Sequence, residues 1–423
     1  MFCLKKSYKK IIGISLVLTV IVGVVGCSSV KPLKEKPDIV DDPVIKNAKL
    51  DENFIDTQMN FSVDLFKETA SNEKGKNVMI SPFSVMTALS IVANGADGET
   101  KEELEKVLGG KYTIEELKKN INAYIESLPS GEKSKLQIAN ALWLNEKDGL
   151  VINDKFINTA VDYYDAEINK GAFTKKTVSD INKWVKKNTD GMIDEIIKEV
   201  SPETVMYVLN AIAFDGEWKI PYEEDSIHED IFHSYSGEKQ KVDFMYSEEL
   251  SYFDDGLATG FKKSYKGGNY SFVAMLPNED IDIDEYVSKL TSESIKETLE
   301  NKIYADVRTS IPKFESEYKI NMNGILNNMG LSQIFDEQNA DLTKLGTCDE
   351  KNIFVSGVNH KTFISVDEKG TKASAVTSIS VEMSAAMTPD EIVEIYLNRP
   401  FVYMIIHEAT NTPLFMGVLN NVE

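Results

Sequence analysis

Arginine is nearly absent from this sequence of 423 residues, in which Arg308 and Arg399 are the only two. Bidentate clamping of phosphates or carboxylates is therefore scarce, because arginine is the side chain that supplies it. Basic residues are outnumbered by acidic ones: the sequence has 46 Lys and Arg and 68 Asp and Glu, which gives a net charge of −22. This balance argues strongly against nucleic-acid binding, which needs a basic surface. A hydrophobic fraction of 42% is otherwise ordinary for a globular protein.

The N-terminus has the pattern of a signal peptide. Residues 1–26 begin with four lysines and continue with the uncharged apolar run 11–25, which is too short to span a bilayer comfortably. The run ends in Val-Val-Gly-Cys-Ser at 24–28, which resembles a bacterial lipobox. We therefore expect cleavage before Cys27 and lipid on that cysteine, which would hold an exported protein on a membrane at the cell surface. An ordinary secretory signal and an N-terminal membrane anchor are the alternatives.

Cysteine is equally rare, which limits covalent cross-linking. If Cys3 leaves with the signal and Cys27 carries lipid, Cys348 stands alone and the mature protein has no internal disulfide. Nothing near Cys348 suggests an activated nucleophile, so a small buried residue is the simpler interpretation. Prolines among charges predict a semi-extended tether over 27–50. The remainder, 51–423, has no second linker or repeat, which favours one large domain.

The hydrophobic patterns predict an α+β fold, with a helix-rich N-terminal half around a large, mostly antiparallel β-sheet system. Ser81-Pro82 predicts the start of a buried helix that stops at Asn94-Gly95. A one-sided apolar stripe over 177–189 predicts a surface helix that lies on another element. The run 205–214 is almost wholly apolar, as in a central strand covered on both faces. Further strands are predicted over 136–144, 270–276, 303–311, 362–366, 401–407 and 413–419.

Enzyme signatures are missing. The sequence has no GxSxG elbow, GxGxxG, Walker loop or CxxC. His407-Glu408 begins like a zinc-binding helix, but Asn411 stands where the second histidine should be. The acidic stretch 280–284 resembles the start of a calcium loop, but it lacks the required glycine and final glutamate. Four histidines leave a Ser–His–Asp site open by count alone, yet no local signature supports one. We predict no catalytic residue, no metal site and no cofactor.

The most informative segment is the long connection 367–399 between two predicted strands. Loops of this length in a compact domain are usually functional or disordered. Its alternate residues form one set that is small and then apolar, and the other set is polar except at Val376. This period of two predicts a strand with an inside and an outside, on the order of 45 Å long. The next residues, 384–389, are small and uncharged and suit a protease cleft. An ordinary edge strand is the alternative.

Several motifs, taken in order, resemble the serpins, a family of serine protease inhibitors that trap proteases by a conformational change. The resemblance covers essentially all of 51–423 and rests on 77–84, 181–191, 209–218, 311–314, 340–342, 360–361, 400–401 and 413–417. The hinge, 367–377, is similar to that of inhibitory members, with an acidic pair, Gly370, Thr371 and a run of small residues. Lys372 and Val376 depart from the family pattern, and both fall on the outward set.

The resemblance implies a suicide substrate. A protease attacks the reactive-centre loop, about 368–398, and forms an acyl-enzyme, after which the cut loop inserts into the main sheet and carries the protease to the opposite pole. The family pattern implies hinge roles for Glu368, Gly370, Thr371, Ala373, Ser374, Ala375 and Thr377. It implies a gate of Ser81, Ser84, Asn210 and His360, through which the strand must pass. It also implies a Lys313–Glu368 pair beside Trp218.

Counting along the family pattern places the scissile bond at Ser384-Ala385, with Met383 or Met387 as alternatives because the loop is a few residues longer than in many members. The loop has no Arg or Lys from Ala373 to Tyr396, which disfavours a trypsin-like target. Elastase-, subtilisin- or chymotrypsin-like serine proteases fit better, and papain-like cysteine proteases are an alternative. The expected partners are the target protease, in a covalent complex, and a membrane, through the lipid. We expect a monomer. A non-inhibitory serpin acting as a binding or chaperone module is the second hypothesis, and an enzyme is the third.

Overall fold

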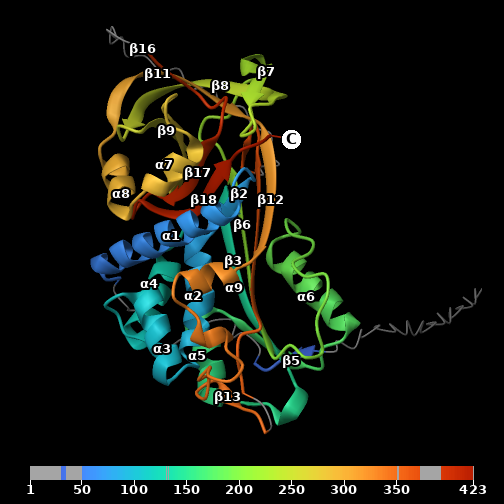
Figure 1. Ribbon diagram of the computed structural model, residues 1–423. Coiled ribbons are helices and arrows are strands. Elements are labelled where there is room, and N and C mark those ends of the chain that lie inside the picture. The colour runs from blue at the N-terminus through green and yellow to red at the C-terminus, as the bar shows by residue number, and fades with distance from the viewer. Residues whose placement is uncertain are drawn as a thin grey trace, which may run out of the picture.

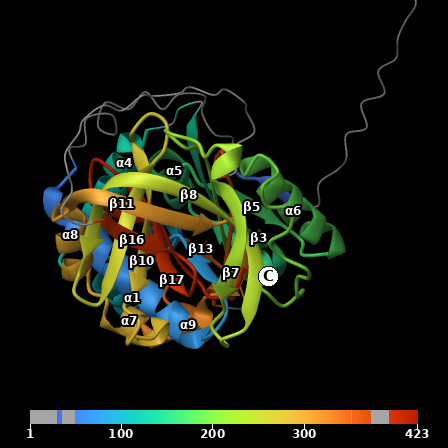
Figure 2. The same cartoon turned by 90° about the horizontal axis from the view of Figure 1, so that it is seen from above.

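The computed structural model describes residues 30–34, 50–129, 131, 133–349, 352–371 and 392–422. The predicted signal peptide, Cys27 and the loop positions from Ala373 to Met387 lie outside these residues. Long strands form a main sheet that runs the height of the molecule (Figure 1). A second sheet curves across the top, where Figure 2 shows β8 and β11 arching over the molecule.

The helices lie mostly in the N-terminal half, as the sequence predicts. They are α1 Glu52–Asn72, α2 Pro82–Ala93, α3 Gly98–Leu104, α4 Ile114–Ser127, α5 Asp154–Tyr164, α6 Lys175–Asn188, α7 Ile283–Lys289, α8 Ser292–Glu300 and α9 Asn323–Asn328, with short turns η1 Glu105–Gly109, η2 Lys147–Gly149, η3 Glu224–Ser226 and η4 Gln333–Phe335. Every residue of α2 is buried, which confirms a helix inside a large core. α6 buries one stripe, including Ile181, Trp184 and Val185, which confirms the predicted surface helix.

The main sheet has the strand order β1-β5-β3-β6-β15-β14-β12. Its strands are β1 Val30–Pro32, β5 Glu167–Gly171, β3 Ser134–Asn145, β6 Met206–Glu217, β15 Gly370–Thr371, β14 Gly357–Val366 and β12 Phe314–Asn321. One face packs on the core around α2, and the other face carries α6 on a separate hydrophobic cluster. β6 contributes Val208 and Ile212 to the first core and Leu209 and Ala211 to the second, which confirms a central strand covered on both faces.

The second sheet has the strand order β16-β11-β8-β9-β10-β17-β18-β2, with β7 paired to β8. Its strands are β16 Ile392–Tyr396, β11 Ile303–Pro312, β8 Lys239–Asp254, β9 Ala258–Ser264, β10 Tyr270–Pro277, β17 Phe401–His407, β18 Thr412–Leu419, β2 Val78–Ile80 and β7 Ile227–His233, and a small ribbon pairs β4 Val151–Ile152 with β13 Gly346–Thr347. β17 and β18 are buried along their whole length. The α+β class with mostly antiparallel sheets is therefore confirmed.

The N-terminal segment differs from the expected tether. Residues 30–32 form β1, which pairs antiparallel with β5 and extends the main sheet at its edge. The side chain of Lys34 then contacts Asp162 on α5 at 2.7 Å. Three residues carry too little pattern to predict a strand, because the pairing depends on an open sheet edge elsewhere in the chain.

The acidic stretch 280–284 is a helix start rather than an ion-binding loop. The carboxylate of Asp282 accepts the backbone N–H of Glu285 at 2.7 Å and so caps α7. Asp284 accepts the hydroxyl of Tyr235 at 2.8 Å. Within the described ranges, no group of three or more His, Cys, Asp or Glu side chains is placed to hold a metal ion.

Candidate functional site

Two residues of the hinge, Gly370 and Thr371, already lie inside the main sheet as β15. β6 and β14 are parallel neighbours over the seven positions Gly357–Phe363 of β14. Above these positions the two strands separate, and β15 lies between them. Thr371 pairs antiparallel with Gly216 of β6 on one side and with Val366 of β14 on the other. The upper end of the main sheet is thus open by one strand, and β15 lies in that opening.

The backbone at Gly370 approaches β6 so closely that no side chain fits. A Cβ atom at this position would lie 2.0 Å from the carbonyl oxygen of Gly216 and 2.9 Å from the Cα of Glu217. The next side chain, Thr371, is fully buried, and its hydroxyl lies 2.5 Å from the hydroxyl of Tyr265. The opening therefore accepts a glycine at position 370 and a small residue with a hydroxyl group at position 371.

Trp218 holds the segment that leads into β15. Its indole N–H donates to the carbonyl of Asp367 and its backbone N–H donates to the carbonyl of Lys369, both at 2.8 Å. The indole is stacked on Tyr265, with ring centroids 4.6 Å apart. One buried aromatic side chain therefore joins the hinge, β6 and the second sheet.

The ion pair expected between Lys313 and Glu368 is present, with 2.9 Å between the ammonium and the carboxylate. Burial alone would raise the pKa of Glu368, but its contacts with Lys313 outweigh burial and leave this pKa below its ordinary value. Burial raises the pKa of the neighbouring Asp367, against the backbone N–H groups of Lys369 and Gly370 that its carboxylate accepts. Two carboxylates therefore hold the start of the hinge: Glu368 through its ion pair with Lys313, and the partly buried Asp367 through backbone N–H groups.

The gate residues lie together six positions below β15. Asn210 and His360 face each other in the register of β6 and β14, and His360 Nδ1 lies 2.6 Å from Asn210 Oδ1. The amide nitrogen of Asn210 donates to the backbone carbonyl of Ser84 at 3.1 Å and also contacts the Ser84 hydroxyl. The Ser81 backbone N–H donates to His360 Nε2 at 3.0 Å. These contacts join the start of α2 to β6 and β14, the two strands of the predicted gate.

Burial lowers the pKa of His360 to about 3, because the whole side chain lies in the core. The ring is therefore neutral at ordinary pH. Nε2 accepts from Ser81, so the proton is on Nδ1, where it donates to Asn210. A histidine fixed in this tautomer holds α2 and β14 together without any charge.

Ser81 does not cap α2 with its side chain. It occupies the N-cap position, but its hydroxyl makes no capping bond and has no hydrogen-bond partner. The helix start is instead held through the Ser81 backbone N–H, which His360 accepts. Ser81-Pro82 thus starts the helix as predicted, but a partner on β14 takes the place of a side-chain cap.

Asn140 belongs to the same arrangement and is missed by the sequence analysis. It pairs with Asn210 in the register of β3 and β6, and its Oδ1 accepts the Asn210 amide N–H at 2.8 Å. A signal was available, since Asn140 interrupts an apolar stretch of β3 in the way that Asn210 interrupts β6. A polar side chain in a strand covered on both faces needs a partner.

The segment that follows α6 covers the closed part of the β6–β14 pairing. The ammonium of Lys361 on β14 donates to the carbonyl of Glu195 at 2.5 Å and forms an ion pair with Glu317. Ile193, Ile196 and Ile197 of this segment are buried in the cluster beneath α6. A strand entering between β6 and β14 would therefore have to pass under this cover.

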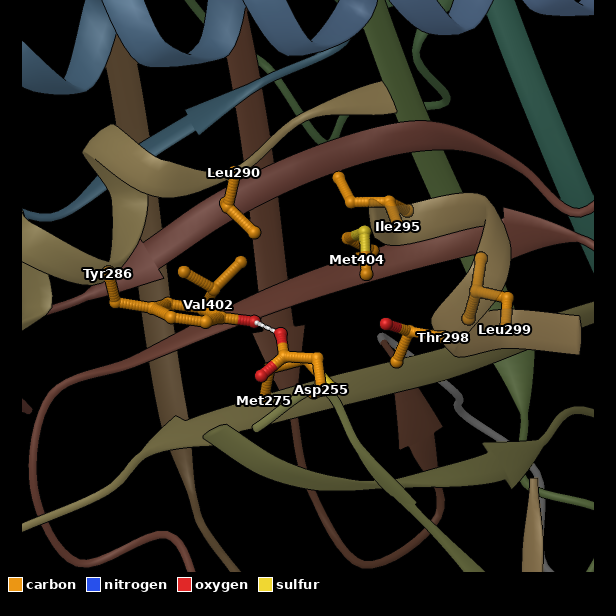
Figure 3. A pocket seen from close by; sticks show the side chains of 9 residues that line it. All are labelled: Asp255, Met275, Tyr286, Leu290, Ile295, Thr298, Leu299, Val402 and Met404. Carbon is orange, nitrogen blue, oxygen red and sulfur yellow. Dashed lines mark hydrogen bonds between the residues drawn. The ribbon is translucent and has the colours of Figure 1, made fainter. Parts of the chain in front are cut away.

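A small cavity lies beneath α7 and α8 (Figure 3). It is lined by Asp255, Met275, Tyr286, Leu290, Ile295, Thr298, Leu299, Val402 and Met404 and holds about 10 Å³. The hydroxyl of Tyr286 donates to Asp255 at 2.8 Å across one end. This volume admits about one water molecule, so the cavity does not accept a small-molecule ligand in this conformation.

Cys348 is partly buried and packs against the main core. Within the part of the chain that the structure describes, none of the helices combines the length and the apolar character needed to cross a bilayer.

Comparison with known proteins places this arrangement in context. Residues 56–422 match the family Serpin, described as serine protease inhibitor. An uncharacterised serpin-like protein of Thermococcus kodakarensis is 29% identical over 375 residues, covering 85% of this chain and 84% of that protein. The native-state structure of the thermophilic serpin tengpin is 44% identical, with a TM-score of 0.86, covering 93% of this chain and all of that one. Its latent-state structure gives 43% identity and a TM-score of 0.78, covering 89% of this chain and 99% of that one. The chain is a member of the serpin family.

Proposed function

We propose that this serpin is a suicide-substrate inhibitor of elastase-, subtilisin- or chymotrypsin-like serine proteases. The observation that carries the proposal is β15, a part of the hinge that is paired between β6 and β14, which pair directly with each other below it. A loop already registered at the top of the opening is placed to continue downward once its far end is cut. Greater similarity to a native than to a latent structure agrees with a loop that has not yet inserted.

The register of β15 gives the expected path of insertion. Continuing the pairing of Thr371 with Gly216 and Val366 brings Thr377 opposite both Asn210 and His360. Residues opposite each other in antiparallel strands point to the same face, so the inward set beginning with Thr371 would face the core around α2. At the gate, a threonine hydroxyl would then stand where Asn210 and His360 now bond to each other.

The energetic argument favours the inserted form at equilibrium. Insertion breaks the parallel β6–β14 pairs and the contact between His360 and Asn210. It replaces one parallel pairing with two antiparallel ones, which are slightly more stable per residue, and it buries apolar side chains of the loop. The uncut form is therefore held by a kinetic barrier at the gate rather than by lower free energy.

The test is a panel of elastase-, subtilisin-, chymotrypsin-, trypsin- and papain-like proteases incubated with the full chain. We expect an SDS-stable complex with at least one of the first three. Mass spectrometry of the released C-terminal fragment should place the cut at Ser384-Ala385, Met383 or Met387. Cleavage by every protease without a trapped complex would identify a substrate and defeat the proposal.

A matched pair of variants separates insertion from simple loop binding. Thr371→Arg places a long charged side chain at a fully buried position, so the loop should be cut without trapping the protease. Ile392→Arg changes the other flank of the loop, where the side chain is 48% exposed, and should leave trapping unchanged. Equal trapping by the two variants would argue against insertion.

We also propose that Cys27 carries lipid and anchors the inhibitor to a membrane. The lipobox-like run before this residue supports the proposal. The mass of the N-terminal peptide after expression with the signal should show diacylglycerol on Cys27. A chain that carries Cys27→Ser and lacks residues 1–26 should be in the soluble fraction, and its retention in the membrane would contradict lipid anchoring through this residue.

A further inference from the structure

The strand β1 fixes the chain to the lower end of the main sheet shortly after Cys27. Val30 pairs with Gly171 of β5, and the backbone N–H of Leu33 donates to the backbone carbonyl of Ile168 at 2.8 Å. The Lys34 ammonium is held by Asp162 at 2.7 Å and by Asn158 at 3.0 Å. Only three residue steps separate Cys27 from Val30, a span of about 10 Å when fully extended. A lipid on Cys27 would therefore hold this end of the molecule against the membrane.

Exposed lysines lie on β1 and α6, although the chain as a whole is acidic and the exposed acids Glu146, Asp165 and Glu203 lie at the same end. Lys31 is exposed on β1, and Lys175 and Lys176 are exposed on the first turn of α6, four and five residues after Gly171. α6 carries five lysines and a single acid, Asp180. Basic side chains close to an anchor are attracted to anionic headgroups.

The same end of the molecule is where an inserted loop would deliver a trapped protease. Continuing the register of β15 against β6 brings residue 384 to the level of Glu203, just before the lower end of β6. Glu203 contacts the Lys147 ammonium at 2.9 Å, and the backbone N–H of Glu146 donates to the carbonyl of Gly171 at 3.1 Å. Gly171 is the partner of Val30. The protease would thus arrive beside β1.

The two arrangements exclude each other. A serine protease of about 230 residues is roughly 40 Å across, and a link of about 10 Å leaves no room for it between this end and a bilayer. If β1 leaves β5, the link runs from Cys27 to Leu50 and can extend to about 80 Å. Because β1 has three paired residues and one ion pair, its release costs little compared with the rest of the sheet.

We propose that β1 sets the distance between the inhibitor and the membrane, and that it must leave β5 before a protease can be trapped on a membrane surface. Docked β1 holds the lower end of the main sheet against lipid and leaves β15 and β16, which flank the reactive loop, at the far end. Released β1 provides the space that the arriving protease needs. This inference rests on the proposed inhibition and on the proposed lipid at Cys27.

The test locks β1 to β5 with a disulfide. Lys31 and Lys170 are opposite each other in the register of β1 and β5, so the variant carries Lys31→Cys and Lys170→Cys. It also carries Cys348→Ser, which leaves no other thiol in the domain. The full chain, with its lipid verified by mass spectrometry, is placed in vesicles of phosphatidylcholine and phosphatidylglycerol. The protease is one that gives an SDS-stable complex with the soluble Cys27→Ser protein. Complex yield is measured with the lock closed and after reduction.

We expect the closed lock to lower complex yield several-fold on vesicles, with cut and released inhibitor in its place, and reduction to restore it. The Cys27→Ser form of the locked protein should inhibit normally in solution. Equal yield from locked and reduced protein on vesicles would overturn the inference while leaving inhibition intact. Loss of inhibition by the soluble locked form would also overturn it, since β1 would then act on insertion itself. Absence of a complex with the soluble unlocked protein would instead defeat the proposed function.

Discussion

At the scale of single residues, His360 and Asn210 form an uncharged contact at the proposed gate. The imidazole is neutral, fully buried and bonded at both nitrogens. Protonation would put a second N–H where Nε2 now accepts from the Ser81 backbone, and it would place a charge in the core. The strength of the gate should therefore depend on pH only well below neutrality.

The sign of this dependence follows from the pKa of His360, which is about 3 in the folded protein against an ordinary value of 6.5. Because the unfolded chain binds a proton more readily, stability is lost as the pH falls from 6.5 towards 3. The loss at pH 5 is about 2 kcal/mol from this residue. His360→Gln should remove that part of the pH dependence, measured as the difference in urea midpoint between pH 7 and pH 5. His233→Gln, at an exposed position, should retain it.

At the scale of elements, the close contact between β15 and β6 makes the hinge sensitive to a single carbon atom. Gly370→Ala would bring a Cβ atom to 2.0 Å from the Gly216 carbonyl, so β15 should leave the sheet. We expect faster hydrogen exchange at the Trp218 amide, which donates to the Lys369 carbonyl next to β15, and earlier cleavage of the hinge by a low-specificity protease. Gly131→Ala is the control, because a Cβ atom there meets nothing within 4 Å. Unchanged exchange in Gly370→Ala would mean that β15 is not held by this contact.

Elements with strong apolar patterns could be predicted, and those that depend on a partner elsewhere could not. α2 and β6 are buried on all sides, so their own residues are sufficient to identify them. β12 alternates buried and exposed residues, but its two glutamates and one lysine make it less hydrophobic than the predicted strands. β1 is paired only because β5 leaves an open edge. β15 is paired only because β6 and β14 separate above Phe363.

The same distinction applies to the candidate site. The resemblance to serpins identified the gate positions and the Lys313–Glu368 pair, because motif order fixes where each residue falls. Asn140, Tyr265 and the contact of Trp218 with Asp367 were not identified, because each depends on the register between distant strands. Their roles remain to be tested by substitution.

At the scale of the whole molecule, the proposed trap predicts that cutting the loop stabilises the protein. Burying Ile379, Val381 and Met383 in the sheet is worth about 5 kcal/mol. For a domain of this size such a gain should raise Tm by roughly 6 °C. Differential scanning calorimetry before and after cleavage near Ser384 is the measurement, with Thr371→Arg as the variant whose Tm should not rise. An unchanged Tm in the cut wild-type protein would be incompatible with a strained uncut form.

Thr371 is paired with Gly216 in a fixed register. An odd or an even change in the length of the hinge therefore decides which face of the sheet each later side chain would take. Side chains along a strand alternate between faces, so one residue added after Thr371 would turn every later position from the α2 side to the α6 side. Val376 and the polar residues beside it would then point into the core. Two added residues would restore the original faces and only shift the loop down the sheet. Variation among inhibitors of this design should therefore tolerate hinge insertions in even steps more readily than in odd ones.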